Sequence, residues 1–214
     1  MRLYALLAAS LGWFTLFLQL YLILHQAAPG VLPAAAAIIS YFSFFTILTN
    51  FMVAFVLTFS FLGTLSSWGT FLSSPTAQTA VAVYITVVGA TYSLLLRELW
   101  NPQGGQKVAD LLLHDGMPVI YVIFWFLFVR KSGLRWQDAI WWLAYPAIYL
   151  GYLLVRGAFF GLYPYPFMDV GAIGYPRMLL NAALFLLVFL GLGLLAVAMG
   201  RWNGWRAQAG QRGL

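Results

Sequence analysis

The chain has 214 residues, of which 63% are hydrophobic and 7% are charged, and its 11 Lys and Arg against 5 Asp and Glu give a net charge of +6. A soluble domain carries about 25% charged residues, and a disordered chain is poor in hydrophobic residues, so the composition excludes both classes. The basic residues are scattered singly rather than clustered, so the positive charge does not indicate nucleic-acid binding.

Continuous apolar runs follow one another along the whole chain, and each is long enough for a membrane-spanning helix of roughly 20 residues. They predict an all-α polytopic membrane protein, a six-transmembrane-helix bundle that forms a single integral membrane domain over residues 1–214. We predict spans over residues of about 3–24, 36–62, 79–99, 108–129, 137–157 and 176–199. The turns between them are marked by Pro29-Gly30 with Pro33, Pro75, Asn101-Pro102, Lys131-Ser132-Gly133, and Pro164 with Pro166.

The second span carries three polar residues, Ser43, Thr46 and Asn50, at positions i, i+3 and i+7. This spacing places them on one face of a continuous helix. Polar groups inside a membrane are costly, so each needs a reason. One reason is helix packing, because Ser, Thr and Asn form hydrogen bonds between membrane helices. The other is a functional site.

The fourth span begins with Asp110 and His114, one helical turn apart on one face, and Pro118 follows one turn later. An ionisable residue inside a span is a functional hypothesis by default. The Asp110 carboxylate can hold the His114 ring in one tautomer, as carboxylates do in hydrolase triads. The alternatives are a histidine bonded to a neighbouring helix and a solvated aspartate that the dipole favours at a helix start.

The fifth span has a longer polar stripe, made of Tyr145, Tyr149, Tyr152 and Arg156. These residues share one helix face over three turns and can line a polar cavity. Alternatively, the tyrosines pack inside the bundle, and Arg156 extends its charged end to the membrane interface. Asp169, in the turn before the sixth span, is a candidate ion-pair partner for Arg156.

The distribution of Lys and Arg predicts cytoplasmic N- and C-termini, because cytoplasmic segments carry an excess of basic residues. Six spans place both termini on one side of the membrane. Seven basic residues lie on that side: Arg2, Arg130, Lys131, Arg135, Arg201, Arg206 and Arg212. Four lie on the other side: Arg97, Lys107, Arg156 and Arg177.

Thr46, His114 and the stripe that ends at Arg156 are all predicted to lie in the outer half of the membrane. Thr46 lies about ten residues into its span, or about 15 Å at the helical rise, and His114 about six residues, or about 9 Å. We therefore expect Thr46 and His114 to face a common cavity. Asn50 and Asp110 are expected beside them.

Several chemistries lack their usual residues in this chain. There is no cysteine, no zinc-ligand spacing and no phosphate-binding glycine loop before a helix. A serine in a nucleophile-elbow pattern is also absent. We expect neither a metal ion nor another cofactor.

Three motifs resemble those of a known family. They are Phe44-Phe45-Thr46-Ile47-Leu48-Thr49-Asn50, then Leu113-His114-Asp115-Gly116-Met117-Pro118, then Val155-Arg156-Gly157-Ala158-Phe159-Phe160-Gly161-Leu162-Tyr163-Pro164-Tyr165-Pro166-Phe167-Met168-Asp169. Their order and their placement on spans resemble the bacterial Pr-six-Pr membrane proteins. That group is similar to the eukaryotic androgen-induced family of six-pass proteins, which hydrolyse fatty-acid esters of hydroxy fatty acids with a membrane-embedded threonine and a histidine.

The resemblance implies that Thr46 is a nucleophile and His114 is the catalytic histidine, with Thr49 as a competing nucleophile. It also implies a multi-pass protein of the bacterial inner membrane that takes a lipid or fatty-acyl substrate from the bilayer. A histidine can act as the base that a threonine hydroxyl needs. Asn50 or the tyrosine hydroxyls are candidate oxyanion donors, and Arg156 can hold a carboxylate. The alternative functions are a non-catalytic lipid-binding protein and a small transporter.

Overall fold

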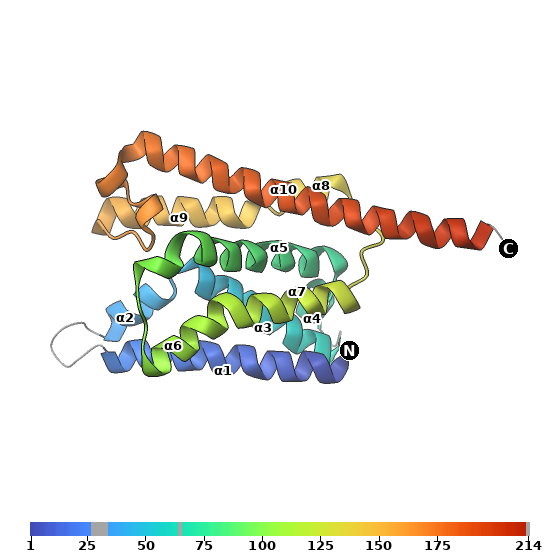
Figure 1. The fold of residues 1–214 in the computed structure, drawn as a ribbon, viewed down its shortest axis with the longest axis horizontal. Helices are drawn as coiled ribbons and strands as arrows, with labels where there is room; N and C mark the ends of the chain where they lie inside the picture. The colour runs from blue at the N-terminus through green and yellow to red at the C-terminus, as the bar shows by residue number, and fades with distance from the viewer. Residues whose placement is uncertain (27–33, 64–65, 213–214) are drawn as a thin grey trace. The chain divides into compact units, whose positions relative to one another are not determined.

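The computed structural model describes residues 1–26, 34–63 and 66–212, with backbone alone from residue 203 onwards. Every regular element in these residues is a helix, as Figure 1 shows. Six helical spans among the described residues are long and apolar enough to cross a membrane, which confirms the predicted class. They are Arg2–His25, Phe45–Leu62, Pro75–Leu99, Gly104–Phe128, Trp136–Phe160 and Val170–Trp202.

Some sequence features lie outside the described part of the chain. Pro29-Gly30 and Pro33, which mark the first predicted turn, are among them. The side chains of Arg206 and Arg212, two of the basic residues that predict the orientation, are also outside it.

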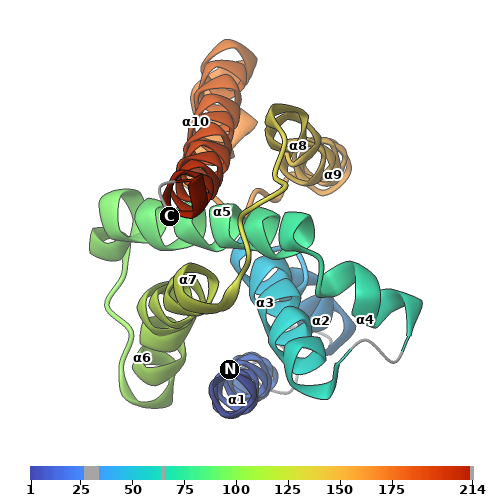
Figure 2. The same ribbon diagram turned by 90° about the vertical axis from the view of Figure 1, so that its right-hand side faces the viewer.

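The chain forms two compact units, Met1–Val129 and Arg130–Leu214. The first unit contains the helices of the first four spans. They are α1 (Arg2–Gln26), α2 (Ala34–Tyr41), α3 (Phe45–Leu62), α4 (Ser67–Leu72), α5 (Pro75–Thr91), the π-helical turn η1 (Tyr92–Leu96), the 3-10 turn η2 (Arg97–Leu99), α6 (Gly104–Leu111), the π-helical turn η3 (Leu112–Gly116) and α7 (Met117–Phe128). In Figure 2, α1 is seen end-on with α3 and α7 beside it.

Small residues and polar side chains hold the helices of the first unit together. A Cβ on Gly12 of α1 would lie 3.0 Å from Met117 Cε and 3.5 Å from Ala54 Cβ, so this glycine lets α1 approach its neighbours closely. The Trp13 indole N–H donates to Thr58 Oγ1 (3.0 Å), and the Tyr4 hydroxyl donates to the Ile120 carbonyl (2.7 Å). Such bonds are expected between helices in lipid, where no water competes for them.

The second predicted span is not one helix, and this corrects the continuous helix expected over residues 36–62. It is interrupted between Tyr41 and Phe45, so that α2 and α3 are separate helices. Ser43 lies in the interruption, and its hydroxyl donates to the Ile39 carbonyl (2.6 Å). Serine side chains compete in this way with backbone bonds, and Phe44 adopts an extended conformation before α3 begins.

The third and fourth spans also differ from uniform α-helices. The third begins at Pro75, earlier than the predicted residue 79, with the Ser74 hydroxyl capping Ala77 N–H (3.2 Å). The fourth begins at Gly104 rather than 108. Each span contains one π-helical turn, η1 near the end of the third and η3 in the fourth.

The second unit contains α8 (Trp136–Trp141), α9 (Ala144–Phe160), the 3-10 turn η4 (Pro166–Met168) and α10 (Val170–Arg212), with a kink at Gly174 (φ 74°). In Figure 1, α9 and α10 run alongside each other. In the connection before α8, Lys131 is largely buried, and a Cβ on Gly200 would clash with its backbone. This burial lowers the pKa of the Lys131 ammonium group.

Candidate functional site

The clearest polar cluster in the first unit lies where the π-helical turns η1 and η3 meet. Proline explains η3, because Pro118 has no N–H for the His114 carbonyl and its ring would clash with that carbonyl in a regular helix. The chain instead bonds Met117 N–H to the Leu112 carbonyl, five residues back. Turns of this kind occur frequently at functional sites.

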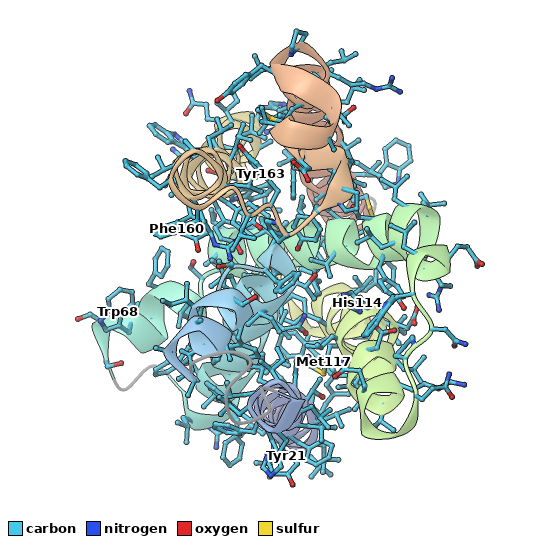
Figure 3. The ribbon with its side chains drawn as sticks, turned by 90° about the vertical axis from the view of Figure 1, so that its left-hand side faces the viewer. Tyr21, Trp68, His114, Met117, Phe160 and Tyr163 are labelled. Atoms are coloured by element: carbon cyan, nitrogen blue, oxygen red, sulfur yellow. The ribbon has the colours of Figure 1, made fainter. Side chains whose placement is uncertain are left out.

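His114 is held on one side of its ring by Asp110. The ring nitrogen Nδ1 lies 3.0 Å from the Asp110 carbonyl oxygen and 3.1 Å from the carboxylate oxygen Oδ1. Both partners are acceptors, so a neutral His114 carries its proton on Nδ1 and a lone pair on Nε2. Within the described residues Nε2 makes no hydrogen bond. Figure 3 shows His114 and Met117 on the same span, within the first unit.

Tyr92 from η1 completes this arrangement. Its hydroxyl donates to Asp110 Oδ2, and its ring stacks on the His114 imidazole with centroids 4.0 Å apart and planes 10° apart. Asp110 thus accepts from the Tyr92 hydroxyl at Oδ2, and its other oxygen, Oδ1, faces His114. All three side chains are largely buried.

A second charged pair lies beside Tyr92, at the more exposed end of the cluster. Arg97 Nη2 lies 2.5 Å from Asp115 Oδ1 and 3.0 Å from Ser93 Oγ, and the guanidinium carbon is 4.9 Å from the Tyr92 ring centroid. The side chains of Arg97 and Asp115 are 41% and 29% exposed. An ion pair this exposed adds little stability by itself, but it links the 3-10 turn η2, which directly follows η1, to η3.

Asn50 connects α3 to the same place. Its amide nitrogen donates to the Thr46 carbonyl (2.9 Å) and to the Leu113 carbonyl (3.3 Å). Leu113 is left without a backbone donor, because Met117 N–H bonds to Leu112 and Pro118 has none to give. Asn50 therefore satisfies a carbonyl that the π-helical turn releases.

Thr46 lies in the first turn of α3, one turn before Asn50, and is 8% exposed. Its hydroxyl makes no hydrogen bond to His114 or to any other residue that the structure describes. The depth predicted for Thr46 assumed a continuous helix from residue 36, whereas α3 begins at Phe45, so the depth of Thr46 stays a prediction. A common cavity for Thr46 and His114 remains a prediction.

Ser43 does not lie on the helix face where it was predicted. It precedes α3, and its hydroxyl donates to the Ile39 carbonyl. The expected three-residue polar face on one helix is therefore reduced to Thr46 and Asn50.

The remaining predicted residues belong to the second unit. On α9, Tyr145, Tyr149 and Arg156 are half-buried, and Tyr152 is 41% exposed. The rings of Tyr149 and Tyr152 lie 6.2 Å apart. The stripe therefore exists as a helix face, and its role remains a prediction.

The predicted ion pair between Arg156 and Asp169 does not form. Arg156 Nη1 donates to the Leu162 carbonyl (2.9 Å). Asp169 Oδ1 accepts from the Gly171 and Ala172 N–H groups (2.9 and 3.3 Å). Asp169 thus caps the start of α10, where the unpaired N–H groups of a helix favour a carboxylate.

Sequence reasoning missed Tyr92, Arg97 and Asp115. Arg97 and Asp115 are 18 positions apart and lie on different spans, so helical periodicity does not bring them together. The sequence feature that could have predicted the irregular turn is Pro118, four residues after His114, because a proline disfavours a regular helix there. No group of three or more acidic or histidine side chains in the described chain is arranged to hold a metal ion.

Comparisons of the chain with protein-family models, with curated proteins and with solved structures find no match.

Proposed function

We propose that this protein is an intramembrane lipid-ester hydrolase related to the Pr-six-Pr group, with Thr46 as nucleophile and His114 as general base. The observation that carries the proposal is the pairing of His114 Nδ1 with Asp110, which leaves Nε2 with a lone pair and without a partner among the residues that the structure describes. A histidine oriented by a carboxylate at one nitrogen and open at the other is the arrangement that activates a hydroxyl nucleophile.

The reaction follows from these roles. Nε2 of His114 takes the proton of the Thr46 hydroxyl as the oxygen attacks the ester carbonyl. The tetrahedral intermediate collapses, and the leaving alkoxide receives the proton from His114, which leaves an acyl group on Thr46. Water, deprotonated by His114, then releases the fatty acid and restores both side chains. Hydrogen bonds between base and nucleophile are often long without substrate and shorten when it binds.

Asn50 supports this site by position rather than by oxyanion binding. Both of its N–H groups have carbonyl acceptors, at Thr46 and Leu113. Because Leu113 directly precedes His114, the amide ties the helix that carries the nucleophile to the turn that carries the base. An oxyanion donor from Asn50 would require one of these bonds to break.

The proposed substrate is a long-chain ester that enters from the bilayer, such as a fatty-acid ester of a hydroxy fatty acid. The proposal includes a place in the bacterial inner membrane. Its support is the six-span architecture together with the motif resemblance around Thr46, His114 and the segment from Val155 to Asp169.

The test is turnover of a long-chain ester by purified protein in lipid nanodiscs, together with labelling by a fluorophosphonate, which an activated hydroxyl attacks with loss of fluoride. Thr46→Ala and His114→Ala should each lower turnover by several orders of magnitude. Thr46→Ala should also abolish labelling. Thr46→Ser should keep part of the activity because it keeps a hydroxyl. Thr49→Ala, one turn away in the same helix, is the matched control and should retain most activity.

Two outcomes would contradict the proposal. Turnover by folded Thr46→Ala near the wild-type rate would make Thr46 structural. Absence of both turnover and labelling in the wild type would favour the lipid-binding or transport alternatives.

A further inference from the structure

Tyr92 makes two contacts with the Asp110–His114 pair. Its hydroxyl bonds to the carboxylate oxygen that does not face His114, and its ring lies parallel to the imidazole at 4.0 Å. No other aromatic ring among the described residues stacks on His114. We propose that Tyr92 is the positioning residue that fixes the orientation and tautomer of His114, an inference that rests on the proposed function for its catalytic meaning.

The physical need for such a residue lies in the freedom of an imidazole ring. A ring anchored only through Nδ1 can tilt and turn about the Cβ–Cγ bond. Parallel packing against a second ring removes that motion, because turning the imidazole would break the face-to-face contact. Nε2 then points in one direction, as a general base must if proton transfer is to be fast.

The hydroxyl of Tyr92 acts on the other member of the pair. Asp110 Oδ1 lies 3.1 Å from His114 Nδ1 and makes no hydrogen bond to any residue that the structure describes, so the carboxylate is free to rotate unless Oδ2 is held. The Tyr92 hydroxyl holds Oδ2. With Oδ1 kept beside Nδ1, the Nδ1–H tautomer stays favoured and Nε2 stays available as the acceptor.

The fold brings Tyr92 to this place by a close approach of two spans. Gly89 lies one turn before Tyr92, and a Cβ there would be 3.1 Å from the His114 carbonyl oxygen and 3.2 Å from Pro118 Cβ. The absence of a side chain lets α5 lie directly against η3. The Arg97–Asp115 pair joins the same two spans on the more exposed side, through η2 and η3. The π-helical turns and Gly89 together allow the contact between Tyr92 and His114.

The experiment uses the full chain in nanodiscs, labelled with ¹⁵N at histidine. The chain has two histidines, so His25→Gln assigns the signals of His114. In the wild type, His114 should show the Nδ1–H tautomer. Tyr92→Phe keeps the ring and loses the hydroxyl, and Tyr92→Leu loses both. Tyr121→Phe is the matched control, because Tyr121 is also buried and bonds to the Gln78 carbonyl (3.1 Å) away from His114.

We expect Tyr92→Phe to give a mixture of tautomers, and Tyr92→Leu to add ring motion visible as signal broadening. Tyr121→Phe should leave the His114 signals unchanged. For ester turnover, Tyr92→Phe should lower kcat roughly tenfold and Tyr92→Leu about 100-fold, with KM little changed, since misplacement of a catalytic group by about 1 Å costs this much.

Unchanged tautomer and mobility of His114 in folded Tyr92→Leu would overturn the inference. If Tyr92→Leu does not fold, Tyr92→Phe decides, and an unchanged tautomer there overturns the role of the hydroxyl. A changed tautomer in a protein whose wild type hydrolyses no ester would support the positioning role while rejecting the proposed function, so the two failures are distinguishable.

Discussion

At the scale of single residues, the structure explains why the polar side chain of Asn50 lies inside a membrane span. The Leu113 carbonyl has no backbone donor, because Pro118 stands where that donor would be, and the Asn50 amide supplies one at 3.3 Å. Asn50 is 1% exposed, so water cannot replace it. A buried carbonyl without a partner carries its full desolvation cost.

We predict that Asn50→Ala lowers the free energy of unfolding by about 1–3 kcal/mol, because it leaves the Leu113 carbonyl unsatisfied. The measurement is equilibrium unfolding in mixed detergent. Thr70→Ala should change it little, because Thr70 is exposed and bonds only to Ser66 in its own turn.

A double variant tests the physical reason directly. Pro118→Ala restores an N–H near Leu113 and His114, so Asn50→Ala should cost less in that background than in the wild type. Equal costs in both backgrounds would show that Asn50 does not compensate for the proline.

At the scale of elements, the contact between α5 and η3 depends on Gly89. A glycine inside a helix is less favourable than alanine by about 0.5–1 kcal/mol, so its presence needs compensation. The compensation here is the approach of the His114 carbonyl to within 3.1 Å of where a Cβ would lie. That approach places Tyr92 against His114.

We predict that Gly89→Ala destabilises the protein, by about 1–3 kcal/mol of overpacking against a smaller gain in helix propensity. It should also lower ester turnover by displacing η3. Gly151→Ala, on α9 with no atom within 4 Å of its added Cβ, is the matched control and should be neutral or stabilising. A neutral Gly89→Ala with normal turnover would mean that the two segments can separate without consequence.

At the scale of the whole molecule, the six spans and the basic residues set the topology. An even number of spans places both termini on one side. The seven-to-four distribution of Lys and Arg predicts that this side is the cytoplasm. Lys131 contributes to this count from a buried position, where its pKa is lowered.

We predict that alkaline phosphatase fused after Leu214 is inactive and that the same enzyme fused after Gln103, in the turn before α6, is active, because this enzyme needs the periplasm. A fluorescent protein fused at the same two points should give the opposite pattern and serves as the control. An active phosphatase at the C-terminus would reverse the predicted orientation.

The sequence alone determined the class of the protein, because roughly 20 consecutive apolar residues have few stable environments other than a bilayer. It also placed Asp110 and His114 together, since residues four apart in a helix face the same way. These predictions depend only on local composition and helical periodicity, and the structure agrees with both.

Only the tertiary structure decided the contacts between helices. Because the helix is interrupted before Phe45, Ser43 and Thr46 do not share a helix face. Asp169 caps the start of α10 instead of pairing with Arg156. The stacking of Tyr92 on His114 joins residues from two spans through turns that do not follow helical periodicity. A helical pattern predicts which side chains share a face, but the shift of one residue in a π-helical turn, and the neighbour that packs against it, depend on how the helices meet.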